Sequence, residues 1–232
     1  MTDRWKRLVP PLAGVGFVAC VVVAFRLLNS SPDAGASGAK VAAYFASHHG
    51  RAVASAALMA YGAALALVYF TGLASYLRRR GSQILSTLTV AGGVLMAVGM
   101  AVAAGTLVAI TDKTSRLDAS ALQAVNQIGS DLPWVMVVGG SAIATLAVGI
   151  ASLRTSAFPK ALGIVITVVG VVAISGIVVW FGFLATGPLT LVVAGYLYQR
   201  SGKPDTITMP DVPAQRDAAA ETQETSPTSA KA

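Results

Sequence analysis

The sequence contains little of what soluble enzymes and metalloproteins use. It has one cysteine and two histidines in 232 residues, and only 12% of its residues are charged. One cysteine cannot form an internal disulfide, and one cysteine with two histidines is a poor ligand set for a metal ion. A soluble domain carries about 25% charged residues. The composition therefore argues against a water-soluble globule, and we expect neither a metal nor a cofactor.

Apolar residues dominate instead, at 55% of the chain with a mean hydropathy of +0.69. The few charges separate five long uncharged runs, which cover residues 8–25, 52–77, 81–111, 132–153 and 161–199. A membrane-spanning helix needs about 20 mostly apolar residues. The first four runs each fit one crossing. The fifth run would make a helix of about 58 Å, nearly twice the hydrocarbon core of about 30 Å, so it predicts two crossings.

We place the turn between these two crossings at Trp180 to Gly182, because glycine permits a turn and the aromatic residues suit an interface. Pro188 then falls inside the sixth helix, where a kink is tolerated. The predicted fold is an all-α, polytopic transmembrane bundle over residues 1–200. Its six helices are expected at about 8–28, 52–77, 84–110, 132–153, 161–180 and 182–199.

The basic residues indicate the orientation of the bundle. With the amino terminus inside, twelve Lys and Arg residues fall in inner segments and five in outer segments, as the positive-inside rule requires. Both termini are then cytoplasmic, and a multi-pass protein of a bacterial inner (plasma) membrane is expected. Arg78, Arg79 and Arg80 are predicted topology anchors, with anionic-lipid binding as a compatible second role. The net charge of +7 is thereby explained without a nucleic-acid partner.

Two outer segments are expected to contain short helices. In the first, Val41, Tyr44 and Phe45 have helical spacing, which predicts an amphipathic turn on the membrane surface. In the second, Asp118 is suited to start a helix and Gly129 to end it. The apolar face of that helix is expected to comprise Leu122, Val125 and Ile128. The polar tail, 201–232, is predicted to be disordered and cytoplasmic.

No Asp, Glu, Lys, Arg or His falls within the five uncharged runs, where such residues usually mark a function. No nucleophile is paired with a base there either, so an enzyme is not expected. His48 and His49 lie in an outer loop and are interpreted as ordinary interfacial residues. The serines and threonines of the helices are expected to bond their own helix backbones or to brace neighbouring helices.

Small residues recur at four-residue spacing on several helices. The longest ridge comprises Gly93, Ala97, Ala101 and Gly105. Small residues let helix backbones approach closely in lipid, so this ridge is the predicted helix-packing site. Similar rows occur elsewhere: Ala52, Ala56, Ala60 and Ala64; Gly16, Cys20 and Ala24; Ser141, Thr145 and Gly149. Internal packing is the first interpretation, and a homo-oligomer face is the alternative.

Three short motifs carry a family resemblance. They are Tyr44-Phe45 followed by Arg51, then Leu77-Arg78-Arg79-Arg80, and Phe158-Pro159-Lys160-Ala161-Leu162-Gly163. Over residues 8–200 the chain resembles small six-helix actinobacterial integral membrane proteins of a domain-of-unknown-function family. The resemblance implies the six-helix topology, and it implies no activity and no catalytic residues.

The leading functional hypothesis is a non-enzymatic accessory or structural membrane component, because no ionisable group is expected to face the interior of the predicted bundle. Membrane lipids are expected partners, together with a protein partner or a second copy of the chain. The alternative is a transporter or channel for a small neutral or lipidic solute. A hydrated cavity between the helices would favour that alternative, and a filled bundle would favour the accessory role.

Overall fold

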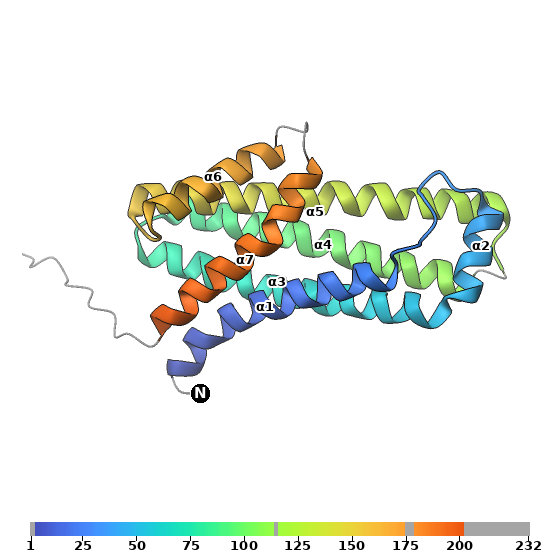
Figure 1. Cartoon of the computed structure of the whole chain (residues 1–232), viewed down its shortest axis with the longest axis horizontal. Helices are drawn as coiled ribbons and strands as arrows, with labels where there is room; N and C mark the ends of the chain where they lie inside the picture. The colour runs from blue at the N-terminus through green and yellow to red at the C-terminus, as the bar shows by residue number, and fades with distance from the viewer. Residues whose placement is uncertain (1–2, 114–115, 175–178, 202–232) are drawn as a thin grey trace, which may run out of the picture. The chain divides into compact units, whose positions relative to one another are not determined.

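The computed structural model describes residues 3–113, 116–174 and 179–201. Every regular element in these ranges is a helix (Figure 1). The helices are α1 (Asp3–Leu27), α2 (Gly38–Ser47), α3 (His49–Arg79), α4 (Gln83–Lys113), α5 (Ala119–Thr155), α6 (Lys160–Ile174) and α7 (Val179–Ser201). The chain divides into two units, Met1–Gly202 and Lys203–Ala232. The predicted disordered tail, 201–232, lies outside the described residues apart from Ser201.

Within the described ranges, four helices are long and apolar enough to cross a membrane: Leu8–Leu27 of α1, all of α3, Gln83–Asp112 of α4, and all of α5. The fifth apolar helix, α6, has 15 residues and is shorter than a usual span. Lipid offers no hydrogen bonds to the backbone, so an apolar segment of this length satisfies its own amides as a helix. The structure therefore indicates a helical membrane protein.

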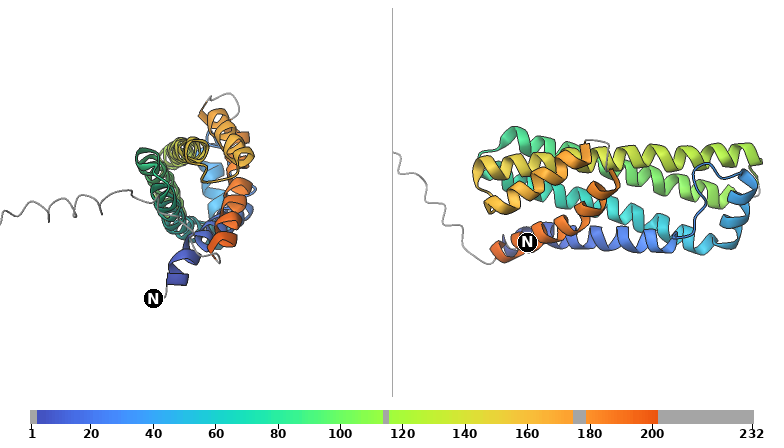
Figure 2. Two further views of the ribbon diagram at one scale, coloured as in Figure 1. Left: turned by 90° about the vertical axis from the view of Figure 1, so that its left-hand side faces the viewer. Right: turned by 45° about the horizontal axis from the view of Figure 1, so that its top comes forward.

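The long helices follow one another around the unit 3–201. Helix α3 packs beside α1, α4 beside α3, α5 beside α4 and α6 beside α5, while α7 packs against both α6 and α1. Figure 2 shows this succession from the end. Close contacts set the direction: Pro10 meets Gly72 near one end of the α1–α3 pair, and Cys20 meets Gly62 further along. These two helices are therefore antiparallel.

Two predicted helix breaks are wrong. Gly129 does not end a helix, because α5 continues from Ala119 through it to Thr155, a length of 37 residues. The turn predicted at Trp180 to Gly182 is also absent, since α7 already begins at Val179. A glycine costs a helix only about 1 kcal/mol relative to alanine, so it permits a break without enforcing one. Pro188 does lie inside α7, as predicted.

The helix start predicted at Asp118 is confirmed. The Asp118 carboxylate accepts a 2.7 Å hydrogen bond from the Ala121 amide, and the Ser120 hydroxyl also donates to it. These donors favour the ionised carboxylate and hold the pKa of Asp118 below its usual range. The α3–α4 turn is closed at Gly81, whose φ is +88°. There the Ser82 and Gly81 amides donate to the Leu77 and Arg78 carbonyls, which is a Schellman motif.

Two apolar clusters stabilise the structure. The larger one fills the bundle along α1, α3, α4, α5, α6 and α7. The smaller one lies where α2 crosses the ends of α3, α4 and α5, and we call this region the cap. Its buried members are Val41, Phe45, Ala52, Ala56, Ala104, Leu107, Ile110 and Leu122.

The spacing of its apolar residues correctly predicted helix α2, but the environment predicted for this helix was wrong. Val41 and Phe45 are 0% and 3% exposed, because they pack into the cap cluster and not onto a membrane surface. Of the face predicted for the second outer helix, Leu122 is buried whereas Ile128 is 59% exposed. On α5 the buried face passes from Leu122 to Asn126, four residues later, and not to Ile128.

Candidate functional site

A close backbone contact joins α4 to α5 through glycine. A Cβ built on Gly140 would lie 2.5 Å from the Gly92 carbonyl oxygen and 2.5 Å from the Met96 amide nitrogen. A Cβ on Gly92 would lie 2.6 Å from the Ala144 amide nitrogen. Only glycine allows two backbones to approach this closely. Neither glycine belongs to the predicted ridge, although Gly92 directly precedes its first residue, Gly93.

The predicted ridge is only half inside the bundle. Gly93 is buried against the ring of Phe70, and Ala97 is 4% exposed in the large cluster. Ala101 and Gly105 are exposed, and a Cβ on Gly105 would meet nothing within 4 Å. The ridge on α3 behaves in the same way, since Ala52 and Ala56 are buried while Ala60 and Ala64 are exposed.

The geometry of the α-helix explains why these rows leave the interface. Residues advance by about 100° each, so a step of four residues overshoots a full turn by about 40°. Three such steps carry Gly105 about 120° away from Gly93. The buried face of α4 corrects the drift with three-residue steps and continues through Met100, Ala104 and Leu107. In contrast, Ser141, Thr145 and Gly149 all stay buried, because α5 has neighbours on several sides.

The hydroxyl groups of the helices mostly bond their own backbones, as predicted. The Ser86, Thr89 and Ser141 hydroxyls donate to carbonyls three or four residues earlier at 2.7–2.9 Å. Ser55 is different, because its hydroxyl donates across the interface to the Ala24 carbonyl of α1 at 3.1 Å. These groups therefore hold the bundle together and offer few free donors to a solute.

One small cavity lies inside the bundle, between α3, α5, α6 and α7. It measures about 20 Å³ and includes the hydroxyl-bearing residues Tyr69, Thr145, Thr186 and Thr190 in its lining. The Tyr69 hydroxyl is hydrogen-bonded to Thr190. A cavity needs about 10–15 Å³ to hold one water molecule. This space can therefore accept about one water and no larger solute in the conformation described.

The end of the bundle away from the cap, which we call the basic end, carries exposed cations. Among the described side chains, it carries no carboxylate. Its cations are Arg78, Arg79, Arg80, Arg154, Lys160 and Arg200. The predicted anchors Arg78, Arg79 and Arg80 thus lie at the α3–α4 turn, where the Arg78 Nε donates to the Ser86 hydroxyl at 3.5 Å. The four carboxylates whose side chains are described, Asp33, Asp112, Asp118 and Asp131, all lie on the cap side.

Aromatic rings join α3 and α7 to the α5–α6 connection at the basic end. The Tyr76 hydroxyl donates to the Ala157 carbonyl at 2.8 Å, and the Phe158 ring contacts both Tyr76 and Tyr196. Arg80 lies 5.5 Å from the centre of the Tyr76 ring, and Arg200 lies 4.9 Å from that of Tyr196. These contacts orient two guanidinium groups along the rings. This end therefore presents ordered positive charge to an anionic surface.

At the cap, the α1–α2 connection is held by one buried amide. Asn126 is 6% exposed, and its side-chain nitrogen donates to the Asp33 carbonyl at 3.0 Å and to the Ala34 carbonyl at 3.3 Å. Replacing Asn126 with alanine leaves both carbonyls without this donor, at a cost of about 1–3 kcal/mol. We expect backbone amides of residues 28–47 to exchange hydrogen at least about tenfold faster, while α6 is unchanged.

Gln127→Ala is the matched control for that experiment, because Gln127 is the exposed neighbour on the same helix. It should leave the exchange of residues 28–47 at the wild-type rate. Equal protection in Asn126→Ala and Gln127→Ala would show that Asn126 does not hold the connection.

The histidines take part in local contacts of the cap. The His48 ring stacks on Tyr44 at 4.4 Å, and its Nδ1 lies 3.0 Å from the Tyr44 carbonyl oxygen. Across the described ranges, no three His, Cys, Asp or Glu residues come together in a way that could hold a metal ion. Cys20 is half-buried between α1 and α3, beside Gly62.

Comparison of the chain with protein-family models, with curated proteins and with solved structures finds no match. The resemblance to the six-helix actinobacterial family therefore stays a prediction. The geometry of the bundle interior, the basic end and the cap is what bears on function.

Proposed function

We propose that the protein is a six-span protein of a bacterial inner membrane, with both termini in the cytoplasm. We propose further that it acts there as a non-enzymatic accessory component. The observation that carries the proposal is the contrast between a filled interior and two chemically distinct ends. Among the side chains described, the bundle interior has no charged group, and the cavity between α3, α5, α6 and α7 measures only about 20 Å³. Such a protein interacts with its surroundings through its two ends and its lipid-facing surface.

The distance between the charged levels supports the membrane placement. The hydrogen bond from the Arg78 Nε to the Ser86 hydroxyl shows that the basic end is level with Ser86 on α4. On the cap side, Gly99 lies against Pro133 and Thr106 lies against Gly129, so Asp131 is level with Ala104. Ser86 and Ala104 are about 27 Å apart at about 1.5 Å per residue, close to a hydrocarbon core of about 30 Å. The cap cluster then lies beyond the hydrocarbon region.

The charge asymmetry supports the orientation. Lys and Arg accumulate on the cytoplasmic side of inner-membrane proteins, whereas carboxylates contribute little to the rule. The basic end holds six exposed cations, three of them consecutive. Assigning this end to the cytoplasm places the cap on the outer side. Its cations can also bind anionic lipid headgroups, at about 1 kcal/mol for each residue near the surface.

Labelling of single cysteines tests this topology. In a Cys20→Ala background, Gln123→Cys places a thiol in the cap and Gln83→Cys places one beside the basic end; both glutamines are exposed. We expect a membrane-impermeant maleimide to label Gln123→Cys in spheroplasts, and Gln83→Cys only after permeabilisation. A reporter fused after Arg200 should be active in the cytoplasm alone. The reverse labelling pattern would refute the orientation.

A second function, passage of a small neutral solute, is favoured by one observation. The cavity of Tyr69, Thr145, Thr186 and Thr190 groups four hydroxyl-bearing residues between α3, α5 and α7. Passage would require the cavity to widen, and Pro188 inside α7 lacks the amide that would stiffen the helix there.

Proteoliposomes distinguish the two functions. The accessory role predicts that the purified protein leaves the glycerol and urea permeability of vesicles unchanged. It also predicts that a second protein co-purifies in a fixed ratio after mild detergent extraction. The solute role predicts faster glycerol or urea entry, and slower entry again in Thr190→Val, which removes one lining hydroxyl. Entry that is faster and sensitive to Thr190→Val would overturn the accessory role.

A further inference from the structure

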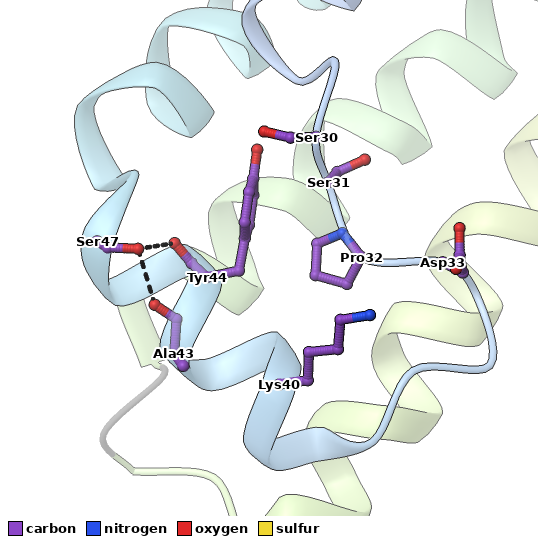
Figure 3. Close-up of a pocket in the computed structure, with 8 residues that line it drawn as sticks. All are labelled: Ser30, Ser31, Pro32, Asp33, Lys40, Ala43, Tyr44 and Ser47. Carbon is purple, nitrogen blue, oxygen red and sulfur yellow. Dashed lines mark hydrogen bonds between the residues drawn. The ribbon is translucent and has the colours of Figure 1, made fainter.

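A pocket of about 360 Å³ opens in the cap between the α1–α2 connection and α2 (Figure 3). Its volume falls in the range of small-molecule sites, about 300–1,000 Å³. Six of its eight lining residues are polar: Ser30, Ser31, Asp33, Lys40, Tyr44 and Ser47. The charged residues supply one cation and one anion, and the others supply hydroxyl groups.

Both walls of this pocket are fixed by contacts outside it. The loop wall is held by the two hydrogen bonds from Asn126 to the Asp33 and Ala34 carbonyls. The helix wall is held by Gly38, on which a Cβ would lie 1.7 Å from the Ala119 carbonyl oxygen, and by Val41, which is fully buried. Since neither set of contacts uses the lining side chains, the pocket is formed before anything binds to it.

The Tyr44 hydroxyl is the strongest sign that the pocket takes a ligand. It is enclosed, and it has no hydrogen-bond partner among the described residues. The ring cannot easily swing it into solvent, because His48 stacks on one face and Phe45 meets it edge-on at 5.2 Å. Figure 3 shows the hydroxyl directed toward Ser30 across the mouth of the loop. A second unpartnered hydroxyl, that of Ser152, borders no such pocket.

The two charges of the pocket lie on opposite walls. Asp33 belongs to the loop and Lys40 to α2, and no ion pair joins them within the part of the chain that the structure describes. Figure 3 shows the Lys40 side chain extending toward Pro32 of the loop. An ammonium and a carboxylate presented separately fit a ligand that carries both signs, because each ligand charge then meets its opposite.

We propose that this pocket binds a small zwitterion that carries an anionic group and a primary ammonium. Lys40 would contact the anionic group, Asp33 would accept hydrogen bonds from the ammonium, and the Tyr44 hydroxyl would donate to the anionic group. Two sources share this chemistry: a free amino acid and the headgroup of an aminophospholipid. The site goes beyond the accessory role and does not depend on it, because it rests on the cap alone.

Binding is measured on the purified full-length protein by calorimetry and by the ligand-induced shift of Tm. The probes are L-alanine, phosphoethanolamine and phosphocholine. Phosphocholine matches phosphoethanolamine but has no N–H to donate to Asp33. We expect binding of L-alanine or phosphoethanolamine and none of phosphocholine. Binding of L-alanine alone would identify a free amino acid as the ligand. Binding of phosphoethanolamine, together with greater stability of the protein in phosphatidylethanolamine nanodiscs than in phosphatidylcholine ones, would identify the lipid headgroup.

Variants test the assigned roles. Lys40→Gln and Asp33→Asn should each weaken binding about tenfold, since each removes a charged hydrogen bond. Arg51→Gln and Asp131→Asn make the same chemical changes at exposed cap-side positions outside the pocket, and should leave affinity unchanged. Tyr44→Phe should weaken binding about threefold. In the absence of ligand it should raise Tm, because it removes an enclosed hydroxyl that has no partner.

Three results would overturn the proposal. The first is that neither L-alanine nor phosphoethanolamine binds, or that phosphocholine binds as well as they do. The second is that the pocket variants lose no more affinity than Arg51→Gln and Asp131→Asn. The third is that Tyr44→Phe lowers Tm without ligand while keeping full affinity, since the hydroxyl would then already have a partner within the protein.

Discussion

Gly140→Ala is expected to destabilise the protein by about 1–3 kcal/mol, although alanine favours a helix more than glycine does. The added Cβ would lie 2.5 Å from backbone atoms of both Gly92 and Met96. Backbone atoms cannot move aside as a flexible side chain can, so α4 and α5 must separate along their shared face. We expect a lower Tm in detergent and a smaller folded fraction by size-exclusion chromatography.

Gly139→Ala is the matched control, one residue away on the same helix. A Cβ there would meet nothing within 4 Å, so the variant should gain the helix propensity of alanine, about 0.8–1 kcal/mol. The two variants have the same composition and opposite expected signs. If both raised Tm equally, the close approach of α4 to α5 would be refuted.

Ala97→Leu and Ala101→Leu form a second pair with a large expected difference. Ala97 is 4% exposed and belongs to the large cluster, so three added carbon atoms must be forced into a filled interior, at about 1–3 kcal/mol. Ala101 lies one turn further along α4 and is exposed. A leucine there should change stability by less than about 0.5 kcal/mol.

This pair also separates two descriptions of α4. A straight ridge from Gly93 to Gly105 predicts that both leucine variants are destabilised in thermal unfolding. The structure predicts that only Ala97→Leu is. Loss of stability in Ala101→Leu, accompanied by a smaller particle in size-exclusion chromatography, would instead indicate that a second copy of the chain covers this face.

The sequence predicts the long helices well, because uncharged run length decides which segments can lie in lipid. It also predicts the helix start at Asp118, since a short carboxylate side chain before a helix has a defined partner in the Ala121 amide. It does not predict the continuity of α5 through Gly129. That glycine is used for packing, since a Cβ there would lie 2.3 Å from the Thr106 side chain.

The candidate sites were harder to predict. The basic residues at 78–80 are legible in the sequence because charge acts at a distance and needs no precise partner. The cap pocket is not legible, because it joins loop residues near Asp33 to α2 and is held by Asn126, about 90 residues later. The rows of small residues leave the interface because an α-helix does not have a whole number of residues per turn. The regular four-residue spacing in the sequence does not show this.

Helix α5 has a mechanical consequence. At about 1.5 Å per residue its 37 residues reach about 55 Å from Ala119 to Thr155, and Asn126, whose amide fastens the cap loop, lies about 42 Å from Arg154 along the same helix. Movement of the loop is therefore passed directly to the helix at Asn126. The only proline of α5, Pro133, leaves one carbonyl of the helix without an amide partner. Any flexing concentrates at that joint, two residues from Asp131.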